Sequence, residues 1–363
     1  MKICFFLPGL NNGGAERIFL YLNEYFDKLG NATEILCATN KGILFKFTKQ
    51  KNIKSLNSKF AILSFFRLKN YIDINRPDVI VASLEIPIIM LGLYNKFFNK
   101  KNRTILIARI ANIYVQPTSL RQKIIYKFME KVINSFDLII CNSEETKKSL
   151  NIIKCKNIEA VKVIYNPVID RTFDEIKKIN INTKKHPVVL TIGRFIEQKR
   201  IDHVIKVFAE TRKILGKGHL VIVGDGIQKE DLKKLGKTLN ISNHITFISY
   251  FNKIPELLRS VDCFVNTSKY EGFGNIFIES IAFCKNTLAY KSRGGASELL
   301  KNTSAFLVPD GRRDLLKKKL VEILKNNFNN YNKDSTYIKN FKKDLIAKHY
   351  YNEILKVYEK NSV

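Results

Sequence analysis

Two carboxylates, Glu271 and Glu279, lie in and just after a glycine-rich segment, KYEGFGNIFIES (269–280). The segment follows the apolar run DCFVNTS (262–268), and a helix is expected to begin near Asn275, so that its first backbone amides can bind a phosphate. Carboxylates also accept hydrogen bonds from neighbouring hydroxyl groups, as in sugars and ribose. We therefore predict a site for a phosphate-bearing sugar compound. We favour it over an acid–base pair for hydrolysis because cations and a helix start accompany the carboxylates.

Two cations, Arg194 and Lys199, stand five residues apart in GRFIEQKR (193–200), directly after the apolar run PVVLTIG (187–193). Cations at the end of a strand suit a diphosphate, whose leaving charge they can stabilise without a metal. Taken alone, the pair also fits ordinary surface ion pairing. Together with the 269–280 segment it favours diphosphate binding.

Two further glycine-rich loops follow apolar runs. GLNNGGAER (9–17) contains Gly13 and Gly14 ahead of an expected helix, so its backbone can approach an anionic ligand closely. It is not the G-x-G-x-x-G dinucleotide fingerprint, and a plain strand–helix turn is the alternative. KSRGGASELL (291–300) is a weak signal by itself and gains weight because it comes next after the 269–280 segment.

Several common site motifs are missing from the sequence. It contains no G-x-x-x-x-G-K-[ST], which argues against a P-loop kinase. It contains no Asp-x-Asp, the usual carboxylate pair for a nucleotide-bound divalent cation, and its five histidines show no metal-ligand spacing. We therefore expect no metal and no cofactor.

The pattern of the chain supplies the elements that these loops need. Short runs rich in Ile, Val, Leu and Phe alternate with longer amphipathic stretches, which predicts parallel sheets covered by helices on both faces. Strands are expected at 2–8, 33–39, 78–83, 104–109, 137–143 and 160–166, and again at 187–193, 219–226, 244–250, 262–268, 286–292 and 305–310. Helices are expected between them, for example at 16–30, 119–136, 311–328 and 338–361.

The predicted fold class is α/β, with two Rossmann-like, doubly wound domains facing each other across a cleft. The pattern breaks after Asn166-Pro167, and we interpret the polar, lysine-rich segment 170–187 as a linker. The predicted domains are residues 1–168 and 185–340, with a C-terminal helix at 341–363 that packs back toward the first domain. Ligands of such sheets bind at the carboxyl ends of the strands, where the four loops lie.

The chain carries 62 Lys and Arg against 33 Asp and Glu in 363 residues, a net charge of +29. The excess is even, with 29 basic and 15 acidic residues in 1–180 and 33 and 18 in the remainder. This even spread, without interleaved aromatic and basic residues, argues against a nucleic-acid partner. A solvated basic surface, or attraction to acidic lipid or to phosphate-bearing substrates, are the interpretations left open.

Six cysteines form no C-x-x-C pair and mostly lie in apolar runs, so we expect buried free thiols in a reducing compartment. No apolar run reaches the length of a membrane span. KICFFL (2–7) stops at Pro8-Gly9, which fits a buried first strand better than a signal peptide. The expected location is the cytoplasm, with any membrane contact peripheral, at the inner face of the cell membrane.

At these loops the chain resembles the retaining glycosyltransferase family 4, which has the GT-B fold. The resemblance spans most of the chain and is strongest over 187–310. The matching motifs are Gly193-Arg194, Gln198-Lys199, Val223-Gly224-Asp225-Gly226, and Glu271-Gly272-Phe273-Gly274 followed by Glu279. The N-terminal GGAER is also typical of many bacterial members.

The resemblance implies a metal-independent, retaining transfer of a sugar from a nucleotide-diphosphate donor, either UDP- or GDP-linked. Arg194 and Lys199 would grip the diphosphate, and Glu271 would contact the hydroxyl groups of the donor sugar; these three are the predicted catalytic set. Glu279 would bind the ribose hydroxyl groups. In such enzymes a donor phosphate is thought to help deprotonate the acceptor, so no side-chain nucleophile is needed.

Backbone groups complete the donor site that the resemblance implies. The amides of Asn275 and Ile276 would hold phosphate at the start of the helix. The first domain would bind the acceptor. The remaining predicted donor-binding residues are Gly13 and Gly14 in the first domain, and Gly224, Gly272, Phe273 and Gly274 in the second.

The chain departs from the family pattern at three places. Arg200 follows the Q-K pair, where Gly is common. Arg109 lies near a position where some members have His, and we count it among the donor-binding residues as a substitute. Residues 282–286, AFCKN, replace an Ala-Cys-Gly-x-Pro run, which should alter the turn into the next strand rather than the chemistry.

The function expected from the sequence is sugar transfer to a glycan acceptor, lipid-linked, in the synthesis of capsule, lipopolysaccharide or another glycoconjugate. The partners expected are a nucleotide sugar, that acceptor and an anionic membrane surface. One alternative is a sugar-nucleotide epimerase of the same fold, although no convincing acid–base set is present. The other alternative is a basic polyanion-binding protein.

Overall fold

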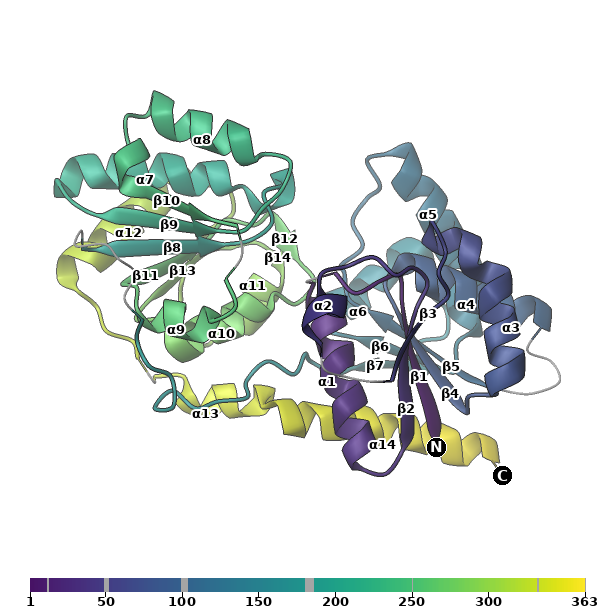
Figure 1. Ribbon diagram of the computed structural model, residues 1–363. Coiled ribbons are helices and arrows are strands. Elements are labelled where there is room, and N and C mark those ends of the chain that lie inside the picture. Colours follow the sequence, from purple (N-terminus) through teal and green to yellow (C-terminus); the bar gives the residue numbers. More distant parts are fainter. Residues whose placement is uncertain are drawn as a thin grey trace. The chain divides into compact units, whose positions relative to one another are not determined.

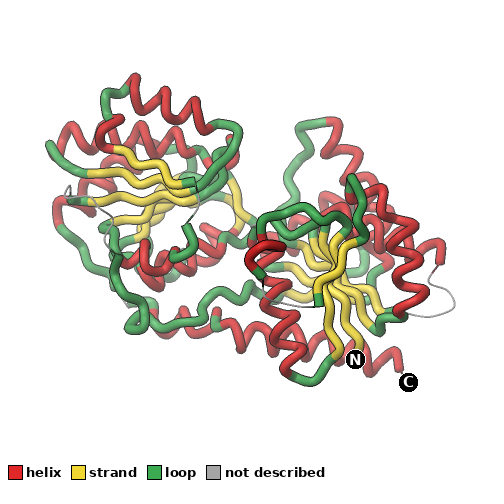
Figure 2. The backbone as a smooth tube through the Cα atoms, viewed as in Figure 1, coloured by secondary structure: helices red, strands yellow, loops and turns green. Residues whose placement is uncertain are grey.

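The chain folds as two compact units in the computed structural model, which describes residues 1–11, 13–48, 52–98, 104–179, 186–249, 251–331 and 333–362. Unit 1 consists of Met1–Pro167 and Lys343–Val363, and unit 2 of Val168–Lys342. The chain therefore passes between the units twice. Each unit contains a sheet with helices on both of its faces (Figures 1 and 2).

The described residues of unit 1 form a seven-stranded parallel sheet in the order β3-β2-β1-β4-β5-β6-β7. The strands are β1 (Lys2–Leu7), β2 (Ala32–Cys37), β3 (Ile53–Ser55), β4 (Val79–Ser83), β5 (Ile105–Ile110), β6 (Leu138–Cys141) and β7 (Val161–Val163). The α-helices are α1 (Gly14–Lys28), α2 (Leu44–Phe47), α3 (Phe65–Asn75), α4 (Glu85–Phe98), α5 (Leu120–Val132), α6 (Glu144–Ser149) and α14 (Lys343–Ser362). Short 3₁₀ turns are η1 (Ala61–Ser64), η2 (Ile133–Ser135) and η3 (Leu150–Ile153).

Strand β1 shows why its run of apolar residues is unbroken. Cys4 and Phe6 face the core under α3, α4 and α5, whereas Ile3, Phe5 and Leu7 face the core under α1 and α14. All five side chains are completely buried. A strand with a core on each side has no solvent face and so needs no polar alternation.

Helix α14 belongs to unit 1 although it comes from the end of the sequence. Its residues Ile346, Tyr350 and Ile354 are buried in the core that α1 also covers. The Tyr21 hydroxyl of α1 donates a hydrogen bond to Asp344, at 2.5 Å. The apolar face of α14 therefore closes one side of the first sheet.

The described residues of unit 2 form a six-stranded parallel sheet in the order β10-β9-β8-β11-β13-β15, and a separate pair, β12 with β14. The strands are β8 (Val188–Ile192), β9 (His219–Val223), β10 (Ile245–Ile248), β11 (Cys263–Asn266), β12 (Tyr270–Glu271), β13 (Thr287–Lys291), β14 (Arg293–Gly294) and β15 (Phe306–Pro309). The α-helices are α7 (Ile201–Leu215), α8 (Lys229–Thr238), α9 (Ile254–Arg259), α10 (Asn275–Phe283), α11 (Gly295–Leu299), α12 (Arg313–Asn326) and α13 (Ser335–Ile338). Short 3₁₀ turns are η4 (Glu197–Lys199), η5 (Ser242–His244) and η6 (Lys339–Phe341).

The predicted strands all occur, several with shorter ends. The strand expected at 160–166 is Val161–Val163, and the one expected at 219–226 is His219–Val223. The sequence analysis missed β3, β12 and β14, which have two or three residues each and are too short to show a period. Residue 250, at the end of another expected strand, lies outside the described residues.

The segment interpreted as a linker, 170–187, falls partly outside the described residues, at 180–185. Its described beginning packs within unit 2. Ile176 is 1% exposed, and the Arg259 guanidinium donates to the carbonyl oxygens of Phe173 and Ile176. This part of the segment is therefore folded against α9.

Candidate active site

The strand order of unit 2 changes direction beside β8. The chain places β9 and β10 on one side of β8 and then crosses to place β11 and β13 on the other. Ligands of such sheets bind at the carboxyl ends of the strands at this switch point. The loops that leave β8 and β11 there are 193–200 and 267–274, the two loops that the sequence analysis ranked first.

A salt bridge joins these two loops. The Lys199 ammonium donates to Oε1 of Glu271, and the Ser268 hydroxyl donates to the same oxygen at 2.8 Å. The charged side chains of Lys199 and Glu271 are only 15% and 11% exposed. The Lys199 stem lies over Gly193, where a Cβ would come within 3.4 Å of it. The carboxylate is thus held through Oε1, and the structure records no hydrogen bond to Oε2 from the described residues.

Backbone contacts fasten the two loops further. The Gln198 side-chain amide donates to the carbonyl oxygen of Tyr270, at 2.8 Å, and the Lys269 amide donates to the carbonyl of Gln198, also at 2.8 Å. The Thr267 hydroxyl donates to the carbonyl of Arg200, at 2.8 Å. Both residues of the Q-K motif therefore hold the 267–274 loop: Gln198 contacts its backbone, and Lys199 contacts the Glu271 carboxylate.

Arg200, where the family commonly has Gly, adopts a left-handed backbone conformation with φ 47°. Glycine takes this conformation without the steric cost that a Cβ brings, which gives a physical reason for the usual residue. The Arg200 guanidinium pairs with Asp310 at 2.6 Å, after β15. This ion pair offsets part of the cost of the backbone conformation. It also means that the Arg200 guanidinium already has an anionic partner in Asp310.

Arg194 lies two residues after β8 and is exposed. The structure records no hydrogen bond or ion pair of its guanidinium with the described residues. Within the 193–200 loop it is therefore the cation best placed to receive an anion.

Helix α10 begins at the end of the 267–274 loop. Its N-cap, Gly274, has φ 77° and provides no side-chain cap. A Cβ at Gly274 would lie 2.7 Å from the ring of Phe277, so the position suits glycine alone. Asn275 and Ile276 form the first turn, and Glu279 lies one turn further; all three are partly buried. The first backbone amides of α10 therefore lie at the end of the loop that carries Glu271, with the positive end of the helix dipole.

The remaining glycines of the motifs serve close approach between backbone segments. A Cβ at Gly294 would lie 1.9 Å from the carbonyl oxygen of Glu271, and one at Gly295 would lie 1.7 Å from that of Phe273. These contacts accompany the pairing of β12 with β14. A Cβ at Gly224 would likewise lie 1.9 Å from the carbonyl oxygen of Gly193. The loop 291–300 thus supports the 269–280 segment directly.

Phe273 and Gly272 lie between Glu271 and the start of α10. The Phe273 ring is 2% exposed and packs 6.1 Å, centre to centre, from the ring of Phe341. Its side chain is therefore part of the core of unit 2 and anchors the loop from beneath.

In unit 1 the strand order changes direction between β1 and β4. The loop after β1 leads to Gly13, the N-cap of α1, which has no side-chain cap, and to Gly14, the first residue of the helix. A Cβ at Gly13 would lie 2.4 Å from the carboxylate of Glu16. Asn12 of this loop lies outside the described residues.

Arg109, at the carboxyl end of β5, is completely buried. Its guanidinium donates to the Tyr350 hydroxyl at 3.0 Å, to the Ser83 hydroxyl at 3.2 Å and to the Asn166 side-chain oxygen at 2.7 Å. The Phe19 ring lies 6.0 Å from it. In this structure Arg109 therefore offers no surface to a donor, and it connects β4, β5, α1 and α14 instead. Arginine is mostly exposed in proteins, so the residue type alone does not indicate this buried role.

Two residues that the sequence analysis did not select also lie at the switch point of unit 1. Leu84 follows β4 with φ 72°, and Glu85 begins α4. The Asn112 amide, after β5, donates to the Glu85 carboxylate at 3.2 Å. The signal that could have found Glu85 is its position directly after a buried strand.

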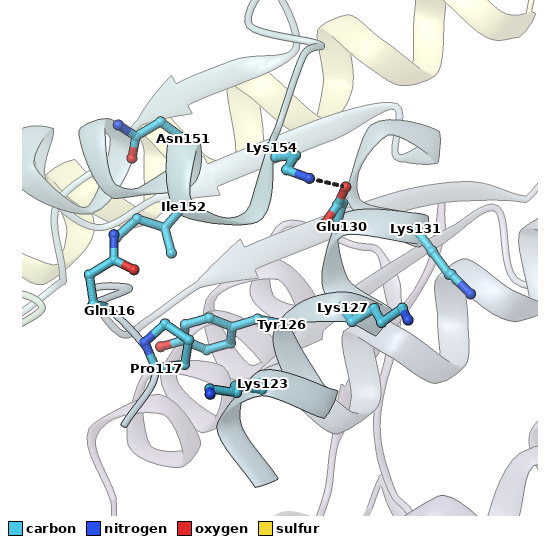
Figure 3. Close-up of a pocket in the computed structure, with 10 residues that line it drawn as sticks. All are labelled: Gln116, Pro117, Lys123, Tyr126, Lys127, Glu130, Lys131, Asn151, Ile152 and Lys154. Atoms are coloured by element: carbon cyan, nitrogen blue, oxygen red, sulfur yellow. Dashed lines mark ion pairs between the residues drawn. The ribbon is translucent and has the colours of Figure 1, made fainter. Parts of the chain in front are cut away.

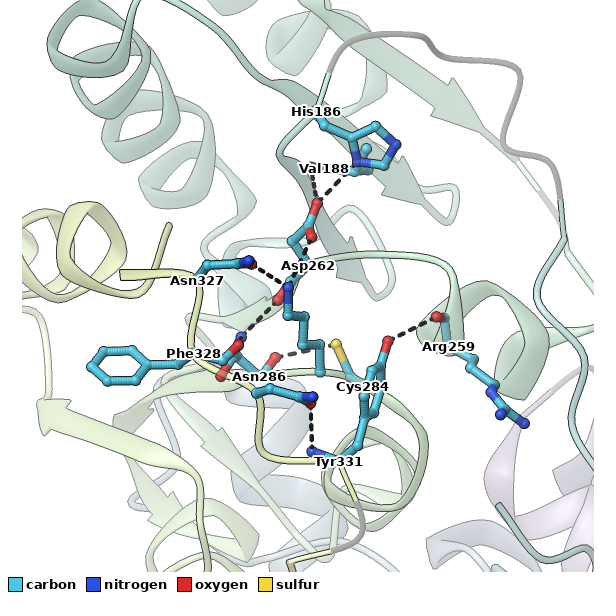
Figure 4. Close-up of polar contacts among 11 residues, drawn as sticks. His186, Val188, Arg259, Asp262, Cys284, Asn286, Asn327, Phe328 and Tyr331 are labelled. Carbon is cyan, nitrogen blue, oxygen red and sulfur yellow. Dashed lines mark hydrogen bonds and ion pairs between the residues drawn. The ribbon is translucent and has the colours of Figure 1, made fainter. Parts of the chain in front are cut away.

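The segment 282–286, where the chain departs from the family pattern, lies at the other end of the sheet of unit 2. The Cys284 thiol donates to the carbonyl oxygen of Asn286 at 3.1 Å. The Asn286 amide donates to the carbonyls of Asp262 and Phe328, at 3.0 Å and 2.8 Å (Figure 4). These contacts lie at the amino ends of β11 and β13, away from the switch point.

Three general properties of the described residues complete the picture. All six cysteines are buried and unpaired. No group of three or more His, Cys, Asp or Glu side chains in the described part of the chain could hold a metal ion. None of the helices found there is both long enough and apolar enough to cross a membrane.

Comparison with known proteins places both halves of the chain. Residues 12–171 match the family described as Glycosyltransferase Family 4, and residues 172–344 match Glycosyl transferases group 1. The lipopolysaccharide core biosynthesis glycosyltransferase LpsE of Rhizobium meliloti is 23% identical over 334 residues, which cover 90% of each chain. A Campylobacter jejuni enzyme, GalNAc-alpha-(1->4)-GalNAc-alpha-(1->3)-diNAcBac-PP-undecaprenol alpha-1,4-N-acetyl-D-galactosaminyltransferase, is 26% identical over 370 aligned positions, covering 95% of this chain and 92% of that enzyme.

Among solved structures, Anabaena Alr3699/HepE in complex with UDP and glucose has the same fold. The TM-score is 0.80 at 18% identity, covering 98% of this chain and 100% of that chain. Two parallel α/β units of this kind make up the GT-B fold. The chain belongs to the family 4 and group 1 glycosyltransferases, and it is a glycosyltransferase. The two Rossmann-like α/β domains and the family expected from the sequence are thereby confirmed.

Proposed function

We propose that this glycosyltransferase is retaining and metal-independent, and that it moves a sugar from a UDP- or GDP-linked donor to a lipid-linked glycan acceptor. The observation that carries the proposal is the contact of Lys199 with Glu271. It unites the loops after β8 and β11 at the switch point of unit 2, next to the start of α10. A cation, a carboxylate and a helix N-terminus at one place suit a sugar attached to a diphosphate.

In this proposal Arg194 and Lys199 bind the diphosphate. Arg194 is exposed, and Lys199 keeps its contact with Glu271 while a second acceptor, a phosphate oxygen, approaches its ammonium. The amides of Asn275 and Ile276 take a phosphate oxygen at the start of α10, with Gly272 and Gly274 giving the backbone room. These groups stabilise the negative charge that the nucleotide diphosphate gains as it leaves.

The two carboxylates have separate roles in the proposal. Glu271 is held through Oε1, so Oε2 accepts a hydrogen bond from a hydroxyl group of the donor sugar. Glu279, one turn into α10, accepts hydrogen bonds from the ribose. The sequence resemblance assigns Gly13 and Gly14, at the start of α1, to donor binding as well.

The stereochemistry and the acceptor are supported by relatives rather than by geometry. The Campylobacter jejuni relative is named as forming an alpha-1,4 linkage on a diphospho-undecaprenol-linked glycan. LpsE is named for lipopolysaccharide core biosynthesis, and a further relative, AmsD of Erwinia amylovora, for amylovoran biosynthesis. HepE is described with UDP and glucose. A uridine nucleotide donor and a cell-surface glycan product are therefore the first to test.

The test is thermal stabilisation of the purified chain by UDP, GDP, ADP and their sugars, with EDTA present. A ligand that binds only the folded state raises the melting temperature by mass action. We expect one nucleotide series to do so without a metal. Arg194→Ala and Glu279→Gln should each weaken its affinity by roughly 10- to 100-fold, the usual loss for a charge-assisted hydrogen bond.

Lys217→Ala is the matched control, because it removes an exposed cation near the amino end of β9, away from the switch point. It should leave nucleotide affinity unchanged. If Lys217→Ala and Arg194→Ala lost nucleotide affinity equally, the change in net charge would explain the loss, and the proposed donor site would be rejected. Stabilisation that needs added Mg²⁺ or Mn²⁺ would reject metal independence.

Product analysis tests the reaction itself. With a lipid-linked acceptor, an α-linked donor should give an α-linked product by NMR, and a β-linked product would reject retention. Conversion of the nucleotide sugar into its epimer with no acceptor present would favour the epimerase alternative instead.

A further inference from the structure

Exposed apolar side chains are unevenly distributed between the two units. Sixteen large apolar side chains of the described residues are exposed, and only Ile214 and Ile227 belong to unit 2. The five exposed phenylalanines all lie on one layer of unit 1, formed by η1, α3, α4 and α5: Phe60, Phe66, Phe97, Phe98 and Phe128. Contiguous exposed apolar surface of this kind marks an interaction site.

These helices cover a single face of the first sheet. Buried residues of α3, α4 and α5 share one core with β1 and β4, and α4 contacts both α3 and α5. Figure 1 shows the three helices together on the side of the sheet away from α1. Their outward surfaces therefore belong to one layer, which we call the α3–α5 face.

Helix α5 carries apolar and basic residues on the same exposed side. Leu120, Ile124 and Phe128 are 74%, 49% and 43% exposed, and they repeat every four residues. The exposed basic residues of this helix are Arg121, Lys123, Lys127 and Lys131. At about 100° per residue, all of these positions fall within an arc of about 160°, less than half of the helix circumference. Met129, on the opposite side, is buried, and so is Val132 at the edge of the arc.

The part of the face formed by η1, α3 and α4 is more aromatic. Phe60, Leu63 and Phe66 are 56%, 64% and 71% exposed. Phe66 packs on Phe65, and Phe65 on Phe98, with ring centres 5.5 Å and 6.2 Å apart. The aromatic residues therefore form a connected group that still presents large faces to solvent.

Basic groups accompany the apolar residues throughout. The Lys59 ammonium lies 5.9 Å from the Phe60 ring, and the Lys131 ammonium 6.0 Å from the Phe128 ring. Beside α5 is a pocket of about 730 Å³, from whose wall Lys123, Lys127 and Lys131 project (Figure 3). In the same pocket Glu130 pairs with Lys154 at 3.0 Å. The hollow beside the helix is thus lined by more positive than negative charge.

We propose that the α3–α5 face docks unit 1 on an anionic lipid bilayer. The apolar and aromatic side chains enter the interface, while the lysines contact lipid phosphates and the pocket beside α5 receives a headgroup. Lysines that flank an apolar row can reach lipid phosphates while the apolar side chains enter the interface. Each basic residue near the surface also adds attraction to an anionic leaflet. The excess of positive charge over the whole chain, +29, adds to this attraction. The inference is independent of the donor chemistry of unit 2.

The test is sedimentation of the full chain with vesicles of phosphatidylcholine, alone or mixed with phosphatidylglycerol. We expect the native chain to pellet with the anionic vesicles at low salt and to be partly released at high salt. The double substitution Lys123→Glu with Lys127→Glu should weaken binding at least about tenfold. Ile124→Ser with Phe128→Ser should weaken it too, and should also make the remaining binding more sensitive to salt.

Matched controls come from unit 2. Lys213→Glu with Lys217→Glu makes the same change in net charge, and Ile214→Ser with Ile227→Ser removes exposed apolar side chains. The apolar control should bind vesicles like the native chain, and the charge control should lose much less binding than the α5 charge variant. Circular dichroism and nucleotide stabilisation establish that every variant is folded.

Three results would overturn the proposal. The first is a native chain that stays in solution with anionic vesicles at low salt. The second is a charge control that loses as much binding as the α5 variant, because net charge would then explain the effect. The third is a dimer that Ile124→Ser with Phe128→Ser converts to a monomer while vesicle binding stays unchanged, because the face would then bind a second copy of the chain.

Discussion

Replacing Arg109 by Met distinguishes a structural role of this residue from a ligand-binding one. The sequence resemblance placed Arg109 among the donor-binding residues, whereas the structure buries it completely. Its guanidinium donates to Tyr350, Ser83 and Asn166, of which two are completely buried and Asn166 is 5% exposed. Met has a similar length and removes all three hydrogen bonds while filling part of the volume.

The expected loss of stability follows from those three partners. A buried polar group left without a hydrogen bond costs about 1–3 kcal/mol. The variant no longer buries a charge, and that relief offsets part of the loss. We therefore expect the free energy of unfolding of unit 1 to fall by about 3 kcal/mol. For a unit of this size that corresponds to a melting temperature lower by about 6–12 °C.

Differential scanning calorimetry measures this change, because two units can unfold in separate transitions. Tyr350→Phe is the matched control: it removes one of the three partners, and should cost about 1 kcal/mol. In Arg109→Met the Tyr350 hydroxyl has already lost its donor, so the double variant should lose less than the sum of the two single losses.

The opposite pattern would refute this reasoning. If Arg109→Met melts within about 1 °C of the native chain but no longer gains stability from any nucleotide sugar, the guanidinium binds the donor. The buried conformation would then not be the one that the donor selects.

Three further perturbations test individual residues of unit 2. Gly294→Ala places a Cβ 1.9 Å from the Glu271 carbonyl oxygen, so nucleotide affinity should fall at least tenfold. The control is Gly216→Ala, at a position that also has a positive φ but has open space around it. This control should lower the melting temperature without changing nucleotide affinity. Burial lowers the pKa of His203 below its ordinary value of 6.5. The folded state therefore favours the neutral imidazole, so His203 stabilises the folded state above pH 6.5, and this contribution is lost as the pH falls below that value. The melting temperature of His203→Gln should therefore fall less between pH 7.5 and 5.5 than that of the native chain. An equal fall would contradict a lowered pKa of His203 in the folded state. Arg200→Gly relieves a left-handed conformation but loses an ion pair, so its free energy of unfolding should stay within about 1 kcal/mol of the native value, as calorimetry can check.

The loops that carry the candidate site could be predicted because they follow long apolar strands. PVVLTIG and DCFVNTS each form a buried strand, and the residues after them lie at the switch point of the sheet, as the βαβ pattern requires. The roles given to individual residues in those loops still await the substitution experiments.

The structure shows contacts between distant segments that the local sequence pattern does not predict. The loop 291–300 was a weak signal of close approach, and the structure shows that the missing side chains of Gly294 and Gly295 make room for the backbone of the 269–280 segment. That contact depends on β12 and β14, which have two residues each and no periodicity to detect. Arg109 was expected near the ligand because it lies near a position where some family members have His, and only the fold brings Tyr350 from 241 residues away to its guanidinium.

The path of the chain through unit 1 has a consequence for synthesis on the ribosome. Residues 1–167 emerge first, but the core that they share with α14 is completed by Ala347, Tyr350 and Ile354, which are made last. Until then the side of the first sheet that α1 and α14 share, including the Arg109 guanidinium, lacks the part of its cover that α14 provides. Unit 2 is one continuous stretch of chain and has no such requirement. The half that is translated first is therefore the half whose folding finishes last, and it is the one that a chain released early would leave exposed to aggregation and proteolysis.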